Sequence, residues 1–265
     1  MHEAAQIVIR PPRKWRPLGP KISVMSELNA VESPLFPSNF INKELGPLVT
    51  LYVDDIVVSG PSANHQKFWD MLSNHLRFEV PQDVHKVLGR THLFDKGELQ
   101  YDMREFAKVT CKLYEEECGS FGGFKKAHTP YLDESALPLE DWNSKGKLCN
   151  SAAKLIMKAY WLARLSRPDL PHALNELSKK ITKWSVNDDR RLFRVFSYLN
   201  STKHYRMRTK LNPEDPWQLC LFTDADHASK TEHGYSTSSF LLVVAGGGSY
   251  FPIALDSSQS FNNRG

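Results

Sequence analysis

The sequence predicts an α+β fold, and three patterns along the chain support this prediction. Between residues 48 and 103, short runs of β-branched and apolar residues are typical of antiparallel hairpins. From 149 to 210, apolar residues recur at the three- and four-residue spacing of amphipathic helices. From 218 to 255 the chain returns to short apolar runs separated by turn residues, which indicates strands.

The first 47 residues contain seven prolines. Proline donates no backbone hydrogen bond and disfavours regular elements. We therefore expect residues 1–47 to be mostly extended or poorly ordered, with one short helix over 24–31.

The stretch 48–59 reads Leu-Val-Thr-Leu-Tyr-Val-Asp-Asp-Ile-Val-Val-Ser. Two β-branched runs flank a pair of carboxylates, so we expect a β-hairpin with Asp54 and Asp55 at its turn. A helix should follow over 62–78, with Ser62 as its N-cap.

A second hairpin is expected over 87–103, turning at Lys96 and Gly97. The next helix should begin near Arg104 and end at Gly119, because glycine is a common residue at helix C-termini. The side chains expected to be buried by this helix are Phe106, Val109 and Leu113.

Residues 119–148 are rich in Gly, Pro and Ser, which predicts a linker. Three helices are expected beyond it, over 151–165, 170–184 and 187–199. The last of them starts with a capping signal at Asn187 to Asp189. Strands are then expected over 218–223, 238–245 and 249–255, with Gly246, Gly247 and Gly248 forming the final turn.

The charge of the chain is concentrated in one region. The whole chain has 34 basic and 30 acidic residues and a sequence pI of about 8.8, but residues 149–210 alone hold 14 basic and 4 acidic ones. A block of this density suits a phosphate backbone, and the alternative is a set of amphipathic helices with basic polar faces. The candidate nucleic-acid-binding side chains are Lys179, Lys180, Lys183, Arg190, Arg191 and Arg194.

Composition argues against a membrane or secreted protein. The longest apolar run has six residues, Phe240 to Ala245, whereas a membrane span needs about 20. The N-terminus has no hydrophobic stretch suited to export, and the four cysteines show no paired spacing. We expect an intracellular protein, cytoplasmic or nuclear, without a signal peptide or a transmembrane segment.

Asp54 and Asp55 are the most informative residues of the chain. Two adjacent carboxylates within an apolar run are costly to bury unless cations neutralise them. Magnesium prefers such oxygen ligands, and two such ions can hold the attacking and leaving oxygens in phosphoryl transfer. The alternative is an ordinary exposed turn, in which aspartate is a favoured residue.

The run around the two aspartates resembles the Tyr-x-Asp-Asp box of reverse transcriptases. The chain from there onward resembles the C-terminal half of a copia-type retrotransposon polyprotein, because further blocks follow in the family's order. These blocks are Val87-Leu88-Gly89-Arg90, Thr129-Pro130, the run from Tyr160 to Leu170, Phe196 to Thr202, Phe222 to Ala228, and Gly234 to Ser238.

The resemblance implies a role for each matching residue. Asp54 and Asp55 correspond to the catalytic, magnesium-binding pair of an RNA-directed DNA polymerase, and Tyr52 to the residue that packs near the primer terminus. Asp224 corresponds to the first metal-binding carboxylate of the RNase H domain. The implied partners are an RNA template, a DNA primer and their hybrid duplex, with no membrane; the oligomeric state is left open.

The resemblance also implies a domain order. After the Pro-rich segment 1–47 come a partial palm and thumb over 48–118, a linker over 119–148, a basic helical connection over 149–210 and a truncated RNase H-like domain over 211–265. The expected architecture is thus a partial reverse-transcriptase palm with an antiparallel sheet, a helical thumb or connection, and a three-stranded antiparallel RNase H-like sheet.

Two departures from the family bear on activity. A palm needs a third carboxylate on an upstream strand, yet Asp54 is the first aspartate of the chain, and no recognisable fingers precede it. The run 256–265 has no Glu, so the later RNase H carboxylates are also missing. We therefore expect an inactive reverse transcriptase/RNase H fragment. One alternative is a non-catalytic nucleic-acid-binding remnant that uses the basic helices, and another is an unrelated interaction protein with an accidental Asp-Asp turn.

Overall fold

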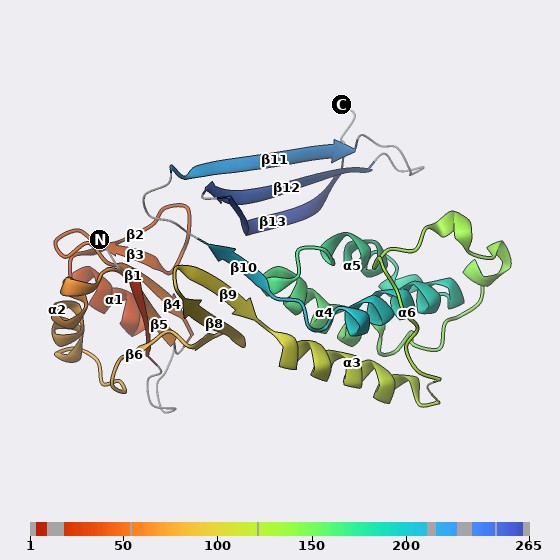
Figure 1. Ribbon diagram of the computed structural model, residues 1–265, viewed down its shortest axis with the longest axis horizontal. Coiled ribbons are helices and arrows are strands. Elements are labelled where there is room, and N and C mark those ends of the chain that lie inside the picture. Colours follow the sequence, from red (N-terminus) through yellow and green to blue (C-terminus); the bar gives the residue numbers. More distant parts are fainter. Residues whose placement is uncertain are drawn as a thin grey trace. The chain divides into compact units, whose positions relative to one another are not determined.

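The computed structural model describes residues 4–9, 19–53, 55–120, 122–210, 216–226, 235–246 and 248–261. The chain divides into two compact units, Met1–Leu88 and Gly89–Gly265, and each is described by itself (Figure 1). Both units combine helices with antiparallel strands, as the α+β prediction requires.

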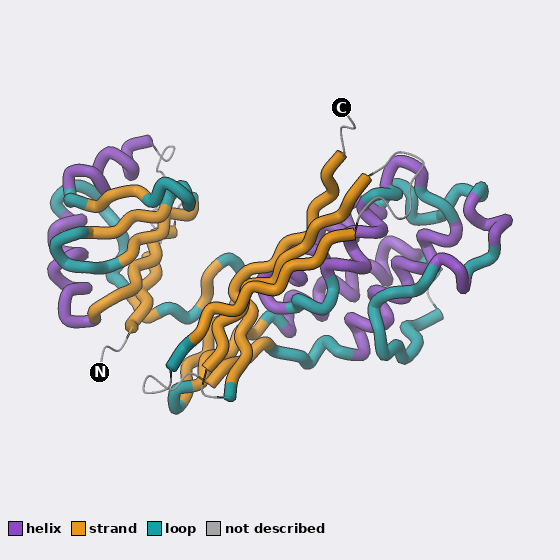
Figure 2. Tube along the Cα trace, turned by 90° about the horizontal axis from the view of Figure 1, so that it is seen from above, coloured by secondary structure: helices purple, strands orange, loops and turns teal. Residues whose placement is uncertain are grey.

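The first unit is built on an antiparallel sheet with the strand order β2-β3-β4-β5-β1-β6. Its strands are β1 (Ala4–Ile9), β2 (Ala30–Glu32), β3 (Asn39–Asn42), β4 (Leu48–Tyr52), β5 (Asp55–Pro61) and β6 (Gln82–Asp83), and the short β7 (Lys86–Val87) ends the unit. Two helices, α1 (Gly19–Glu27) and α2 (Ser62–Ser73), lie beside the strands (Figure 2).

Both helices contribute to one core. Met25 of α1 and Phe68 and Leu72 of α2 are buried in the same cluster as Val49 and Val58 of the sheet. Alternate strand residues point to opposite faces, so the helices cover a single face of the sheet. The other face carries the residues between these buried positions.

The structure differs from the expectation for residues 1–47, since β1, α1, β2 and β3 fall within them. The helix spans Gly19–Glu27 rather than 24–31, because the chain forms strand β2 from Ala30. Pro34 and Pro37 lie in the β2–β3 connection, and Pro47 immediately precedes β4. Pro20 occupies the first turn of α1, where its missing N–H removes no helical hydrogen bond. These prolines therefore stand where regular structure tolerates them.

Helix α2 begins and ends differently from the expectation. Its N-cap position is taken by Pro61, with no side-chain capping bond, so Ser62 is already the first helical residue. The helix ends at Ser73 rather than at 78, although Leu76 is still buried. Leu76 keeps the apolar spacing of the helix although it lies beyond its end, so the spacing alone predicts a longer helix.

The second unit contains the predicted second hairpin. Strands β8 (Arg90–Asp95) and β9 (Glu98–Asp102) pair antiparallel, and β10 (Met207–Lys210) adds to the other edge of β9. Lys96 and Gly97 have φ values of 47° and 79°, as the favoured two-residue hairpin turns require. This turn is confirmed at the expected residues.

Four helices form the main core of the second unit, together with buried residues of the loops that join them. They are α3 (Arg104–Cys118), α4 (Ala152–Ser166), α5 (Pro171–Ser178) and α6 (Val186–Ser201). Helix α5 is shorter than expected, because the chain forms a separate 3₁₀ turn, η3 (Ile181–Lys183), after it. The predicted apolar stripe of α4 is confirmed, and its buried members include Leu155, Ile156 and Leu162.

Helix α3 buries a different face from the predicted one. Its buried residues are Ala107, Thr110, Cys111 and Tyr114. Val109 is 53% exposed, while Phe106 and Leu113 are only partly buried. The aromatic stack of Tyr114 on Phe196 of α6, with ring centroids 4.5 Å apart, supports this rotation of the helix toward α6.

Residues 119–148, expected to be a linker, pack on the helical core. They contain two 3₁₀ turns, η1 (Glu134–Ala136) and η2 (Leu139–Trp142), and they bury Ala127, Leu137 and Leu148. The Gly- and Pro-rich composition correctly indicated an absence of long elements, but it did not indicate a lack of packing.

Helix α6 begins with a capping box. The Ser185 hydroxyl accepts a hydrogen bond from the Asp188 backbone N–H, and the Asp188 carboxylate accepts from the Ser185 backbone N–H. The expected cap at Asn187 to Asp189 was therefore two residues too late. Asn187 instead donates from Nδ2 to the Pro138 carbonyl, at 2.7 Å.

The chain closes with a three-stranded antiparallel sheet, as predicted. Its strands, β11 (Gln218–Asp226), β12 (Tyr235–Gly246) and β13 (Ser249–Phe261), are longer than expected. A register shift between Leu242 and Val243 places a β-bulge in β13. Among the described residues, no helix is both long and apolar enough to cross a membrane.

The N-termini of α2 and α6 allow a matched test of these capping assignments. Ser185→Ala should lower the free energy of unfolding by about 1–2 kcal/mol, because it leaves an orphan N–H of α6 without its acceptor. Ser62→Ala should change it by less than about 0.5 kcal/mol, since Ser62 makes no capping bond. Urea unfolding followed by circular dichroism measures both, and equal losses would contradict the assignment.

Candidate functional site

The β4–β5 hairpin carries the residues expected to act on metal and primer. Tyr52 is the cross-strand partner of Asp55, so only Val53 and Asp54 form the connection. Asp55, which was expected at the turn, is instead the first residue of β5. Asp54 itself lies outside the described residues. Val53 has φ = 50°, a left-handed conformation that is unusual for a β-branched residue. Such strain costs about 1–3 kcal/mol, and it is found most often at functional sites.

The register decides which side chains of the hairpin reach the open face of the sheet. Leu51 and its partner Ile56 are buried against the helices. Tyr52 and its partner Asp55 therefore share the opposite face, because cross-strand partners point to the same side. Tyr52 is 45% exposed and Asp55 is half-buried. The hairpin thus presents an aromatic ring beside a carboxylate.

The ligand set of this site suits one divalent cation. Magnesium commonly takes one or two carboxylates and completes its shell with water or phosphate oxygens. Asp54 and Asp55 supply that number. The neighbouring strand β1 pairs with β5 and contains no acidic residue. Within the described part of the chain, no three His, Cys, Asp or Glu side chains are grouped to hold a metal ion. Two carboxylates are a ligand set that one divalent ion can use, whereas a two-metal centre needs more ligands.

Asp224 belongs to the second unit. It lies near the end of β11, is exposed, and has Ser239 as its partner on β12. The Ser239 hydroxyl donates to the Asp224 backbone carbonyl, at 3.5 Å. The strand was expected over 218–223, but it extends to Asp226, so Asp224 lies within it rather than after its end.

The six predicted nucleic-acid-binding side chains differ in their surroundings. The side chain of Arg191 is only 3% exposed, and its Nη1 lies 3.1 Å from Glu134 and 3.5 Å from Asp188. Asp188 is itself buried. This guanidinium group is held between two carboxylates of the protein.

Arg190 and Arg194, the other two arginines of α6, also contact the segment 129–141. Arg190 forms an ion pair with Asp141, at 2.5 Å. Arg194 donates to the backbone carbonyl of Thr129 from Nε, at 2.8 Å, and to its hydroxyl from Nη2, at 2.9 Å. Together with Arg191, they fasten residues 129–141 to the helix.

The three lysines lie after or at the end of α5. Lys179 pairs with Glu176 at 2.6 Å, and the Lys180 ammonium lies 5.8 Å from the centre of the Trp142 ring. Lys183 is exposed. Of the six predicted residues, Lys183 is therefore the one whose surroundings most favour contact with a phosphate backbone.

Arg167 and Asp169, within the run from Tyr160 to Leu170, form a buried polar network that the sequence did not predict. Arg167 donates to the Thr202 carbonyl and hydroxyl, at 3.1 and 2.7 Å, and forms an ion pair with Asp169 at 2.7 Å. Tyr198 donates to the same carboxylate, at 2.7 Å. Partial burial acts to raise the pKa of Asp169, but the bonds from Arg167 and Tyr198 outweigh it and hold this pKa below its usual value.

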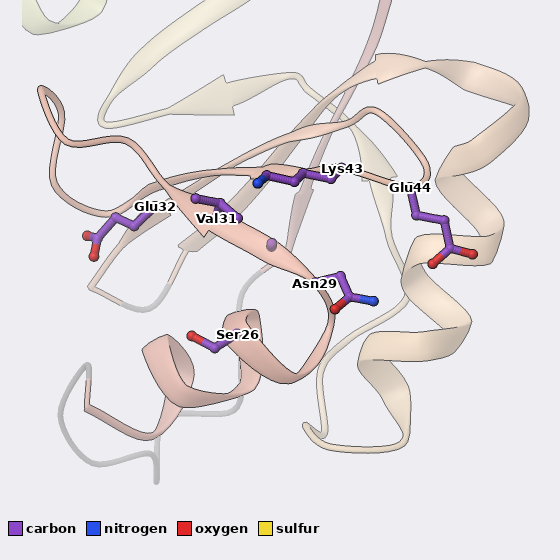
Figure 3. A pocket seen from close by; sticks show the side chains of 7 residues that line it. Ser26, Asn29, Val31, Glu32, Lys43 and Glu44 are labelled. Atoms are coloured by element: carbon purple, nitrogen blue, oxygen red, sulfur yellow. The ribbon is translucent and has the colours of Figure 1, made fainter.

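A hollow of about 670 Å³ in the first unit does not involve the hairpin. It is lined by the end of α1, by β2 and by residues after β3 (Figure 3). Glu32 and Glu44 point to opposite sides of it, and Lys43 lies between them. These polar side chains do not converge on one point, so the hollow has no geometry for binding a specific ligand.

Comparison with protein-family models and with curated proteins finds no match for this chain.

The Arg167 network predicts a pH-dependent contribution to stability. Asp169→Asn should lower the free energy of unfolding by about 3 kcal/mol at pH 7, because a buried guanidinium loses its counter-charge. The folded-state pKa of Asp169 is depressed, so its contribution is present above the ordinary value near 4 and is lost as the pH falls through the folded pKa. Thermal unfolding from pH 7 to pH 3 should show the gap between wild type and variant closing; a constant gap would contradict this.

Proposed function

We propose that this chain is a fragment of a copia-type reverse transcriptase/RNase H polyprotein that binds nucleic acid and one divalent cation without extending primers by itself. The observation that carries the proposal is the two-residue hairpin, which places Tyr52 and Asp55 side by side on the open face of a helix-backed sheet. The order of sequence blocks that resemble the family supports the same assignment.

The hairpin residues have different proposed roles. Asp54 and Asp55 would hold the cation, which when bound would neutralise them and attract phosphate oxygens. Tyr52, with nearly half of its surface exposed beside Asp55, offers an aromatic face against which a nucleotide can pack. The buried partners Leu51 and Ile56 keep the hairpin fixed on its sheet.

The same geometry argues against polymerase activity for the chain alone. Strand β1, next to β5, has no carboxylate to bring to the hairpin, so a second metal ion would have too few ligands among the described residues. Stabilising both the attacking and the leaving oxygen needs that second ion. Binding without turnover is the expected behaviour.

The basic part of the second unit favours nucleic-acid binding in its own right, which is the non-catalytic alternative. Lys183, Lys203 and Lys210 are all exposed. Exposed cations that release counterions from a phosphate backbone give binding that weakens steeply with salt. This activity does not depend on the hairpin carboxylates.

A measurement of metal binding distinguishes the hairpin cation site from the non-catalytic alternative. Asp54→Asn with Asp55→Asn should weaken binding of Mg²⁺ or Mn²⁺ at least about tenfold, because the ion loses its charged ligands. Asp70→Asn is the matched control, since Asp70 is an exposed carboxylate of the same unit on α2. Isothermal titration calorimetry measures all three proteins.

Two outcomes would contradict the proposal. Equal metal affinity in the hairpin variant and the Asp70→Asn control would show an accidental Asp-Asp turn. Robust magnesium-dependent primer extension by the wild-type chain would show that it carries a complete polymerase site.

A further inference from the structure

A cavity of about 140 Å³ lies within the second unit, where the end of α4, the β8–β9 hairpin and strand β13 meet. The residues that matter for its chemistry are Arg90, Tyr101, Arg164, Ser166 and Ile253. A space of this size holds several water molecules, and hence a group as large as phosphate. None of the residues that line the cavity belongs to the hairpin of the first unit.

Arg90 brings a cation to this cavity without a carboxylate partner among the described residues. Its guanidinium lies 3.6 Å from the centre of the Tyr101 ring. Nη1 donates to the Leu165 carbonyl and Nε to His92 Nε2, each at 3.2 Å. None of these partners is a carboxylate, and burial lowers the pKa of Arg90 from its usual value. A partly desolvated charge without a carboxylate partner favours an anion.

Two further features line the same cavity. Arg164, in the last turn of α4, is exposed, so it marks a side of the cavity that solvent reaches. Ile253 is the extra residue of the bulge in β13, because Leu242 pairs with Ala254 and Val243 with Pro252. A bulged residue is left out of the strand ladder, which leaves its backbone available to a ligand.

Capping of α4 accounts for only part of this arrangement. The bond from Arg90 to the Leu165 carbonyl is a favourable contact between a cation and a helix C-terminus. This contact explains neither the presence of Arg164 nor the cavity that both arginines line. The guanidinium fork has five N–H donors, and two of them are used by Leu165 and His92.

We propose that this cavity binds a phosphate group between the guanidinium groups of Arg90 and Arg164. Guanidinium forks match phosphate oxygens, and a tetrahedral phosphate can accept from two forks that lie in different planes. One of the two arginines, Arg164, belongs to the basic stretch 149–210, where phosphate is the expected anion. That the phosphate comes from nucleic acid rests on the proposed function.

Inorganic phosphate titrated into the full chain tests the site. The Arg90 Nε–H signal, assigned by its loss in Arg90→Lys, should shift in a saturable manner in NMR spectra of protein with ¹⁵N-labelled arginine. Arg164→Gln should weaken phosphate binding about tenfold or more, because a charge-assisted donor is lost. Arg208→Gln is the matched control, since Arg208 is exposed and does not line the cavity.

The source of the phosphate is tested with two oligonucleotides that differ only in a 5′-phosphate. Tighter binding of the phosphorylated one, abolished by Arg164→Gln, assigns the cavity to a terminal phosphate. Equal binding of both, weakened by Arg164→Gln more than by Arg208→Gln, assigns it to a phosphodiester.

An unmoved Arg90 signal, or equal weakening by Arg164→Gln and Arg208→Gln, would overturn the site. Arg164 is exposed, so its variant tests the proposal even if Arg90→Lys unfolds the chain. Metal binding by the hairpin uses carboxylates of the other unit, so failure here and failure of the proposed function are distinguishable.

Discussion

The length of one connection controls the candidate site in the first unit. With only two residues between β4 and β5, Asp55 must share a face with Tyr52, and Ile56 must enter the core. A shift of one residue would exchange these faces and bury the carboxylate, at a cost of several kcal/mol. The left-handed Val53 is the backbone strain that this short turn carries. The apolar residues on the helix-covered face stabilise the hairpin against that strain.

In the second unit, several basic side chains stabilise the fold and are therefore not available to bind a ligand. Arg167 and Arg191 are buried and neutralised by carboxylates, and Arg194 holds the loop at Thr129. The excess of basic residues between 149 and 210 therefore overstates the charge available to a polyanion. What remains of this excess is an exposed set at the surface. Outside this stretch, the partly buried Arg90 contacts the Leu165 carbonyl, His92 and the Tyr101 ring.

Sequence reasoning predicted the elements whose signals are local. The turn at Lys96-Gly97, the apolar stripe of α4 and the three final strands depend on neighbouring residues, and the structure confirms them. The face of α3 and the packing of 119–148 depend on contacts with distant helices, which periodicity does not contain. The shared face of Tyr52 and Asp55 was not predicted, because a turn at Asp54 and Asp55 would place Asp55 in the connection rather than in a strand. The burial of Arg191 did not, because its partner Glu134 lies 57 residues away.

Anomalous diffraction from crystals of the full chain grown with Mn²⁺ tests the central claim most directly. The account predicts one anomalous peak at the β4–β5 turn, about 2.0–2.2 Å from carboxylate oxygens of Asp54 and Asp55. A hairpin without bound metal at saturating Mn²⁺, or a peak held by other side chains, would contradict it.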